Sequence, residues 1–205
     1  MTDVNNFLYN ISSSDPDYYG ISSKILAVGG NNIEPGFNPT YVSQHWLEGY
    51  NQAVVSNKQF SYIIASADGC PTDYPPDNAQ PPTIYNPGQC YHNPDYSINW
   101  TQEDLYKVTW EYSYSMPSPE IYEVHGAHAD QWHHIGIYSY VTKNRTMAFV
   151  GEMTQFRACE QVGGIGCVDL TLFPFDAFQM FFDRIYGDTR IINSLKWSTD
   201  IAHAY

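Results

Sequence analysis

Basic residues are scarce in this chain. Its 205 residues include 9 Lys and Arg against 22 Asp and Glu, which gives a formal net charge of -13. A surface of that sign repels phosphate backbones and anionic lipid headgroups, so nucleic acids and anionic membrane surfaces are not expected partners. No run of 18 apolar residues occurs, so we also expect no membrane-spanning helix.

Several catalytic signatures are missing as well. The chain has no G-x-S-x-G nucleophile motif, no phosphate-binding glycine loop and no C-x-x-C pair. The glycines of residues 163–167, GGIGC, sit beside a cysteine and favour a closed turn over a nucleotide site. The sequence therefore indicates no cofactor.

Cysteine is limited to four residues, and their spacing suggests two local disulfides. Each pair brackets a loop rich in Gly or Pro, so we predict Cys70–Cys90 and Cys159–Cys167. Four cysteines allow two other pairings, and four unpaired thiols are the alternative. Disulfides, three N-x-S/T sequons and a composition with 18 Tyr favour a secreted or cell-surface protein.

What the chain does contain is an alternation of strand-like and helix-like segments. Hydrophobic residues make up 43% of the chain, which is enough for the core of one packed domain over residues 1–205. Residues 69–100 form a long loop with seven of the 13 prolines, pinned by the first disulfide. We expect strands at 25–30, 60–67, 106–114, 120–124 and 147–156, and helices from Asn38, over 126–144 and from Pro174. That order predicts an α/β fold with a mainly parallel sheet.

Carboxylates follow or end the expected strands. Because the carboxyl ends of parallel strands meet at one edge, these side chains are expected to share a crevice. They are Glu34, Asp68, Glu111, Glu120 and Glu152. The alternative is that they cap helices or pair with the few basic residues.

Aromatic residues surround two of these acids. Trp110 and Tyr112 flank Glu111, and Tyr122 lies near Glu120. Flat aromatic faces stack on sugar rings, although such residues also pack in cores. We therefore expect Trp110, Tyr112 and Tyr122 to bind a carbohydrate substrate, together with Glu120 and Glu152.

Paired carboxylates can hydrolyse a glycosidic bond when one is protonated and the other is ionised. The aromatic neighbours of Glu111 would raise its pKa, so we expect Glu111 to act as the acid. Glu34 or Asp68 would then be the ionised partner.

Four histidines lie close together at positions 125, 128, 133 and 134. On a helix, His133 and His134 point away from His128, and no pair has the i, i+4 spacing of a helical zinc site. We expect no metal site, with His128 packing near the helix start and His133 and His134 solvated. A metal-dependent hydrolase that uses these histidines is the weaker alternative.

The segments WTQEDLYKVTWEYSYSMPSPEIY, GAHADQWHHIGIYSY, MAFVGEMTQFRACEQ and SLKWSTDI resemble secreted bacterial glycoside-hydrolase-like β/α-barrel proteins, which are distantly similar to the family 25 lysozymes. The resemblance covers residues 25–201 and implies a TIM-type β/α barrel. Family 25 enzymes place an aspartate two residues before the catalytic glutamate, whereas here Asn32 precedes Glu34. A full barrel takes about 250 residues, and with about five strands counted the barrel would be incomplete or part of a larger whole.

Together these patterns predict an extracellular, glycan-active protein with a carboxylate-lined cleft at the mouth of a barrel. The alternative is a non-catalytic carbohydrate-binding or cell-surface structural protein built on a degenerate barrel, which the Asn32 departure favours.

Overall fold

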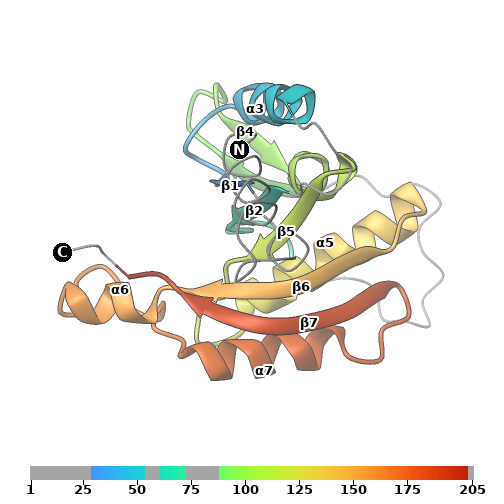
Figure 1. Cartoon of the computed structure of the whole chain (residues 1–205). Coiled ribbons are helices and arrows are strands. Elements are labelled where there is room, and N and C mark those ends of the chain that lie inside the picture. Colours follow the sequence, from blue (N-terminus) through green and yellow to red (C-terminus); the bar gives the residue numbers. More distant parts are fainter. Residues whose placement is uncertain (1–28, 54–60, 73–87, 203–205) are drawn as a thin grey trace, which may run out of the picture.

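The structure, a computed structural model, describes residues 29–53, 61–72 and 88–202 (Figure 1). Strands alternate with helices along most of this range, as expected. The strands are β1 (Gly29–Asn32), β2 (Ser61–Ala65), β3 (Gln89–His92), β4 (Asn99–Thr101), β5 (Ser115–Pro119), β6 (Met147–Thr154) and β7 (Ile191–Asp200). The helices are α3 (Thr40–Ala53), α4 (Gln102–Tyr106), the π-helical η2 (Lys107–Glu111), α5 (Ala127–Lys143), α6 (Phe156–Gln161) and α7 (Pro174–Ile185).

The described residues form a mixed α/β structure with small separate sheets, in which five of the seven strands run parallel. β1, β2 and β5 form one parallel sheet in that order, and β6 pairs in parallel with β7. The two sheets meet at a single parallel bridge between Glu120, just beyond β5, and Met153 of β6. The rings of Tyr62 in β2 and Trp197 in β7 meet edge to face, with their centroids 6.0 Å apart. The five parallel strands are therefore curved enough for side chains of non-neighbouring strands to touch.

The prediction of a TIM-type barrel was wrong. Among the described residues, only these five strands run parallel, in two small sheets, and β1 and β7 do not pair with each other. The remaining two strands, β3 and β4, form a separate antiparallel hairpin inside the long proline-rich loop. A closed barrel needs a ring of paired strands, and here the array ends at β7.

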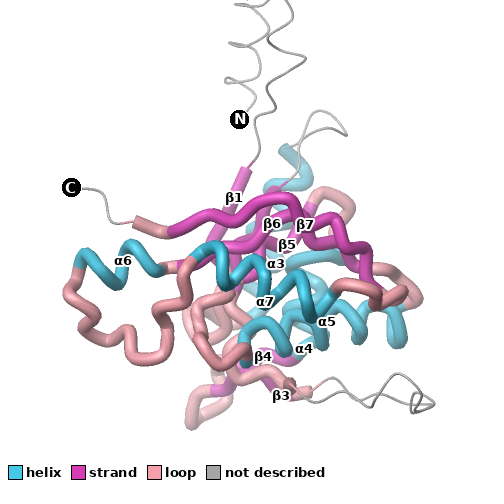
Figure 2. Tube along the Cα trace, turned by 90° about the horizontal axis from the view of Figure 1, so that it is seen from below, coloured by secondary structure: helices cyan, strands magenta, loops and turns pink. Residues whose placement is uncertain are grey.

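A large part of the core lies between β6, β7 and helices α5 and α7, which run beside each other in Figure 2. Phe149 of β6 contacts Trp132 of α5 at 6.2 Å and Phe181 of α7 at 5.0 Å. Gly136 permits this packing, since a Cβ there would lie 2.8 Å from the Ile191 side chain of β7. The helices predicted over 126–144 and from Pro174 are thereby confirmed as α5 and α7.

The strand predicted over 106–114 was wrong, because that segment is helical up to Glu111. Thr101 caps α4: its hydroxyl oxygen accepts a hydrogen bond from the Asp104 backbone N–H, and the Asp104 carboxylate accepts one from the Thr101 N–H at 3.0 Å. This reciprocal capping box starts the helix. Its core-facing side chains, Leu105, Tyr106 and Val108, are buried. Strand β5 begins only afterwards, at Ser115.

Both predicted disulfides are present, Cys70–Cys90 and Cys159–Cys167. Within the described ranges, every helix is too short or too polar to cross a membrane. A single domain over residues 1–205 stays a prediction.

Candidate functional site

The carboxyl ends of β1, β2, β5, β6 and β7 enclose one pocket of about 350 Å³. In Figure 1 these ends lie on the side of α6 and the C-terminus. The pocket is lined by Asn32, Glu34, Ser66, Asp68, Glu120, Tyr122, His128, Gln155, Leu170 and Ile201. Three of the predicted acids therefore share one pocket: Glu34, Asp68 and Glu120.

The first acid reaches the pocket through a tight turn after β1. Ile33 is buried and its N–H donates to the Ile64 carbonyl at 2.8 Å, which continues the pairing with β2. The chain then turns, with the Phe37 N–H donating to the Glu34 carbonyl at 3.2 Å. The Asn32 amide donates to the Glu34 carboxylate at 2.7 Å. Burial raises the pKa of Glu34, with Asn32 opposing that shift and Asp68 adding to it.

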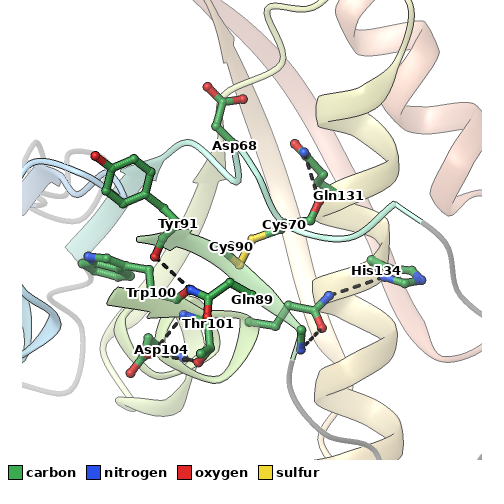
Figure 3. The surroundings of a disulfide bond; sticks show 12 residues. Asp68, Cys70, Gln89, Cys90, Tyr91, Trp100, Thr101, Asp104, Gln131 and His134 are labelled. Atoms are coloured by element: carbon green, nitrogen blue, oxygen red, sulfur yellow. Dashed lines mark hydrogen bonds between the residues drawn. A yellow bond between two sulfur atoms is a disulfide. The ribbon is translucent and has the colours of Figure 1, made fainter. Parts of the chain in front are cut away.

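The second acid, Asp68, is held by a disulfide-anchored loop after β2. Figure 3 shows Asp68 directed away from the Cys70–Cys90 bridge, while Gln131 of α5 donates to the Cys70 carbonyl at 3.1 Å. Gly69, between Asp68 and Cys70, has a φ of +76°, and a Cβ there would lie 2.1 Å from the Cys90 carbonyl oxygen. Only glycine fits that backbone, so Asp-Gly-Cys fixes where the Asp68 carboxylate starts.

His128, near the start of α5, fixes the charge state of Asp68. Its Nδ1 accepts a hydrogen bond from the Tyr122 backbone N–H at 3.1 Å, so the proton of the neutral ring lies on Nε2. Nε2 then donates to Asp68 Oδ1 at 2.6 Å. This bond lowers the pKa of Asp68, with burial opposing it, so the carboxylate is ionised near neutral pH. Asp68 keeps 68% of its side chain exposed and can still meet a substrate.

The third acid, Glu120, lies directly after β5 and is only 2% exposed. Its Oε1 has no hydrogen-bond partner in the structure. Burial, followed by the negative charges of Glu34 and Asp68, raises the pKa of Glu120 to about 8, against a smaller opposing effect of Tyr122. Glu120 is therefore protonated near neutral pH, beside an ionised Asp68 in the same pocket.

Among the described residues that line the pocket, none is Lys or Arg. The acids are instead surrounded by neutral polar groups from Asn32, Ser66, Tyr122 and Gln155. Burial and the nearby carboxylates raise the pKa of Tyr122, so its hydroxyl remains a hydrogen-bond donor. The pocket can thus donate and accept hydrogen bonds to a neutral substrate and carries a proton donor and an anion.

Glu152, also predicted to bind substrate, is buried in β6 and does not line this pocket. Its side chain is 0% exposed, and neither carboxylate oxygen has a hydrogen-bond partner within the described structure. Burial raises the pKa of Glu152 to about 8, Ser198 opposes the shift and Asp200 adds to it. It is a neutral acid inside the sheet near neutral pH.

Glu111, the predicted acid, lies elsewhere. It ends η2 before β5 begins, whereas Glu120 follows β5, so the two acids lie at opposite ends of that strand. Its side chain is exposed, and its backbone carbonyl accepts a hydrogen bond from Arg145 at 3.0 Å. Trp110 and Tyr112 flank Glu111 in the chain and lie at the same end of β5. The Arg145 guanidinium lies over the Trp110 ring, 5.8 Å from the ring centroid. Neither Trp110 nor Tyr112 lines the pocket, whereas Tyr122 does.

The histidines divide between the pocket and the packed helices. His134 is buried rather than solvated as predicted, and His133 is only partly exposed, with its Nε2 2.9 Å from Asp188. Across the residues that the structure describes, no group of three or more His, Cys, Asp or Glu side chains is arranged to hold a metal ion.

Sequence reasoning missed the contribution of His128, Ser66 and Gln155 to the pocket. His128 contacts Asp68, 60 positions earlier in the chain, so no local motif could reveal it. Ser66 and Gln155 each follow a strand, as the acids do, and the same strand-end argument applied to polar residues would have found them. No protein-family model matches this chain, and no curated protein or solved structure matches it either. The resemblance to family 25 lysozymes stays a prediction.

Proposed function

We propose that this protein hydrolyses glycosidic bonds of a neutral glycan, with Glu120 as the proton donor and Asp68 as the ionised carboxylate. One observation carries the proposal: the same pocket holds a buried carboxyl group, Glu120, and an exposed one, Asp68, that lies 2.6 Å from His128 Nε2, and these surroundings raise the pKa of the first and lower the pKa of the second. Glycoside hydrolysis needs this division between an acid and an anion.

The chemistry follows from the two protonation states. Glu120 gives its proton to the oxygen of the scissile bond as the bond from that oxygen to the sugar carbon breaks. Asp68 either attacks the sugar carbon or takes a proton from the attacking water, so one water molecule is consumed overall. Glu34, held by the Asn32 amide, accepts hydrogen bonds from sugar hydroxyls beside them.

The electrostatics select the substrate class. Three acids and no lining Lys or Arg disfavour a phosphorylated or carboxylated substrate, because a second anion would meet uncompensated negative charge. Neutral sugars instead use the hydrogen-bonding groups that the pocket offers. The two disulfides favour an oxidising compartment, so an extracellular glycan is the proposed target.

A non-catalytic carbohydrate-binding role is the second candidate. It is favoured by Asn32, which stands where the resembled family has an aspartate and which engages Glu34 instead. Such a protein would use the same pocket to bind a glycan without turning it over.

Reducing-end release from a panel of neutral polysaccharides, combined with binding to the same panel, distinguishes the two candidates. Hydrolysis is expected for the wild type, and Glu120→Gln should lose about 10² to 10⁴-fold in turnover while still binding, since the amide keeps the shape but donates no proton to the leaving oxygen. Glu111→Gln is the matched control, because Glu111 is exposed and outside the pocket.

Undiminished turnover by Glu120→Gln would remove Glu120 from the role of acid. Binding without any turnover by the wild type would replace the hydrolase with the binding protein. Neither binding nor turnover of any neutral glycan would refute the carbohydrate proposal as a whole.

A further inference from the structure

Strand β7 is the last strand of the β6–β7 sheet, and helix α7 packs beside it. Among the described residues, β7 pairs only with β6, so the other edge of this ten-residue strand offers unpaired backbone groups. Figure 1 shows α7 running along β7. Long exposed edges are normally paired, covered or shielded, because they otherwise template contacts with another chain.

The side of α7 next to this edge is aromatic. Ala177, Phe181 and Ile185 face the sheet and are fully buried. The helix meets α5 on another side, where Arg184 pairs with Asp130. On the remaining side lie Phe175, Phe178, Phe182 and Tyr186, spaced one helical turn apart; we call these four residues the aromatic face of α7.

This aromatic face is exposed at its two ends and half-buried in its middle, where Phe178 and Phe182 pack against the core. Phe175 is 67% and Tyr186 is 70% exposed. Phe178 stacks on Phe182 at 6.1 Å and Phe182 on Tyr186 at 5.1 Å. The stacking of Phe178, Phe182 and Tyr186 on each other uses flat ring faces that a sugar ring would otherwise contact, which argues against a glycan as the occupant.

A groove of about 460 Å³ joins the aromatic face to the strand edge. It lies between the end of α7 and the first half of β7. Its walls hold the apolar Phe182, Ile185, Tyr186, Ile191 and Leu195 together with Gly187, Asp188, Thr189 and Asn193. Ile192, which alternates with Ile191 and so faces the other side of the strand, is 49% exposed. The aromatic face and the strand edge are thus joined by a groove that is apolar on its helix side and partly polar along the turn before β7.

We propose that this surface binds a second copy of the chain, with a two-fold axis that pairs the β7 edges antiparallel and packs the two aromatic faces against each other. A two-fold contact uses the same patch on both copies, and a strand edge beside an apolar helix face is complementary to itself in this way.

The exposed apolar area is a substantial part of what a dimer needs. With roughly 200 Å² for a fully exposed large side chain, Phe175, Tyr186 and Ile192 together expose roughly 350 Å². Standard interfaces take about 800 Å² from each partner. The groove adds little, because Ile185, Ile191 and Leu195 are buried, so pairing of the β7 edges and the half-buried Phe178 and Phe182 would supply the rest.

Charge also favours a second copy on this surface. Each chain carries a net charge of -13, so two copies repel over most approaches. The four residues of the aromatic face are uncharged, and the carboxylate of the groove, Asp188, is paired with Arg190 and His133, so contact there places little uncompensated negative charge together. Salt should therefore strengthen the dimer by screening the repulsion, the opposite of what an ion-paired interface would show.

Sedimentation velocity of the full chain over micromolar concentrations tests the proposal, at low and at high ionic strength. We expect a monomer–dimer equilibrium that salt shifts toward the dimer. Tyr186→Asp and Phe175→Asp should each weaken the dimer by about 30-fold or more, because they place carboxylates opposite each other in an apolar contact. Tyr41→Asp is the matched control: Tyr41 is an aromatic residue of α3, 58% exposed, and should leave the equilibrium unchanged.

Ile192→Lys on β7 provides a variant that leaves α7 intact, in case the helix variants fail to fold by circular dichroism. It should also weaken the dimer. A wild-type chain that stays monomeric at every concentration and salt would overturn the proposal. So would a dimer that survives Ile192→Lys and the folded α7 variants, or one that Tyr41→Asp disrupts equally.

Discussion

Largely buried acidic residues have opposite pKa shifts at the two ends of the parallel strands. At the amino ends, acidic side chains are clamped by bases: Asp188, just before β7, bonds Arg190 at 2.8 Å and His133 at 2.9 Å. Although burial opposes it, these hydrogen bonds lower the pKa of Asp188 to about 2. At the carboxyl ends, burial without a basic partner raises the pKa of Glu120 and of Glu152 to about 8.

A second clamp at the amino ends follows the same rule. Glu103 of α4 accepts hydrogen bonds from Lys143, at the end of α5, at 2.7 Å and from the Tyr138 hydroxyl, and Lys107 lies 3.4 Å away. The chain has 9 basic residues, and several of them are placed here rather than at the pocket. The comparison teaches that the amino ends are built for stability and that the carboxyl ends leave acids in unusual protonation states, as active sites do.

The largest expected effect on stability comes from breaking the clamp at the amino end. Asp188→Asn leaves Arg190 and the partly buried His133 without their anion, and should lower the free energy of unfolding by about 3 kcal/mol at pH 7. Urea unfolding measures it. Asp169→Asn is the control, because Asp169 is exposed at the carboxyl end and Asn tolerates its left-handed backbone conformation.

The sign of the pH dependence sharpens that test. The pKa of Asp188 is depressed in the folded state, so its contribution is present at neutral pH and is lost as pH falls through about 2. A loss below about 0.5 kcal/mol in Asp188→Asn would mean that the clamp is not stabilising.

The contribution of the buried acids at the carboxyl end to the free energy of unfolding should depend on pH in the opposite way. Glu120 and Glu152 have raised pKa values in the folded state, so the folded protein holds protons that the unfolded chain has released. Their stabilising contribution is complete below pH 4.5 and is lost as pH rises through about 8, by up to about 1.4 kcal/mol per pH unit for each group.

Glu152→Gln isolates this effect, because the amide fills the same space and does not titrate. The variant should match the wild type near pH 5 and exceed it in unfolding free energy at pH 9, by urea unfolding at each pH. Glu160→Gln, at an exposed position of α6, serves as the control. If Glu152→Gln follows the wild type at both pH values, Glu152 is ionised as an ordinary carboxylate.

This contrast between the ends also explains how much the sequence could predict. Periodicity and cysteine spacing predicted α5, α7, β2, β6 and both disulfides, because these depend on local patterns. Alternation in residues 106–114 favoured a strand, yet the capping box at Thr101 and burial of Leu105 made a helix. Strand β7 was not predicted, since its pattern of burial does not alternate regularly. A closed barrel was expected by resemblance, and the pairing of strands that decides closure is a tertiary property.

For the pocket, the strand-end argument predicted Glu34, Asp68 and Glu120, and the aromatic residues around the acids predicted Tyr122, and all four line it. Glu111 was chosen as the acid because Trp110 and Tyr112 flank it, and it was placed at the end of a strand because the helical segment 106–111 was taken for one. Which acid is protonated depends on burial and on distant partners such as His128, and these are not visible in local sequence.

A smaller effect is expected from His128, which holds Asp68 in its ionised form at the carboxyl end. His128→Leu removes the donor to Asp68, so the pKa of Asp68 should rise and the acidic limb of the pH–rate profile should move to higher pH, with about a tenfold loss in turnover. His128→Gln places an amide N–H near the position of Nε2 and should restore most of the profile.

The pH–rate profile of glycan hydrolysis for the two His128 variants and the wild type makes the measurement. A purely structural role of His128 predicts that both variants lose activity equally with no shift of the acidic limb. That result would remove His128 from the role of positioning Asp68.

The smallest effect lies within the second clamp of the amino end, and it asks which of two lysines maintains it. Lys143 is the closer partner of Glu103 and also lies over the Tyr106 ring at 5.6 Å, whereas Lys107 is more exposed and lies farther from the carboxylate. Lys143→Met should therefore cost about 1 kcal/mol of unfolding free energy, and Lys107→Met less than about 0.5 kcal/mol. Urea unfolding of the two variants provides the comparison, and Lys196→Met on the exposed side of β7 controls for the loss of one positive charge. Equal costs for Lys143 and Lys107 would show that net charge, rather than the geometry of the clamp, stabilises this end of the sheet.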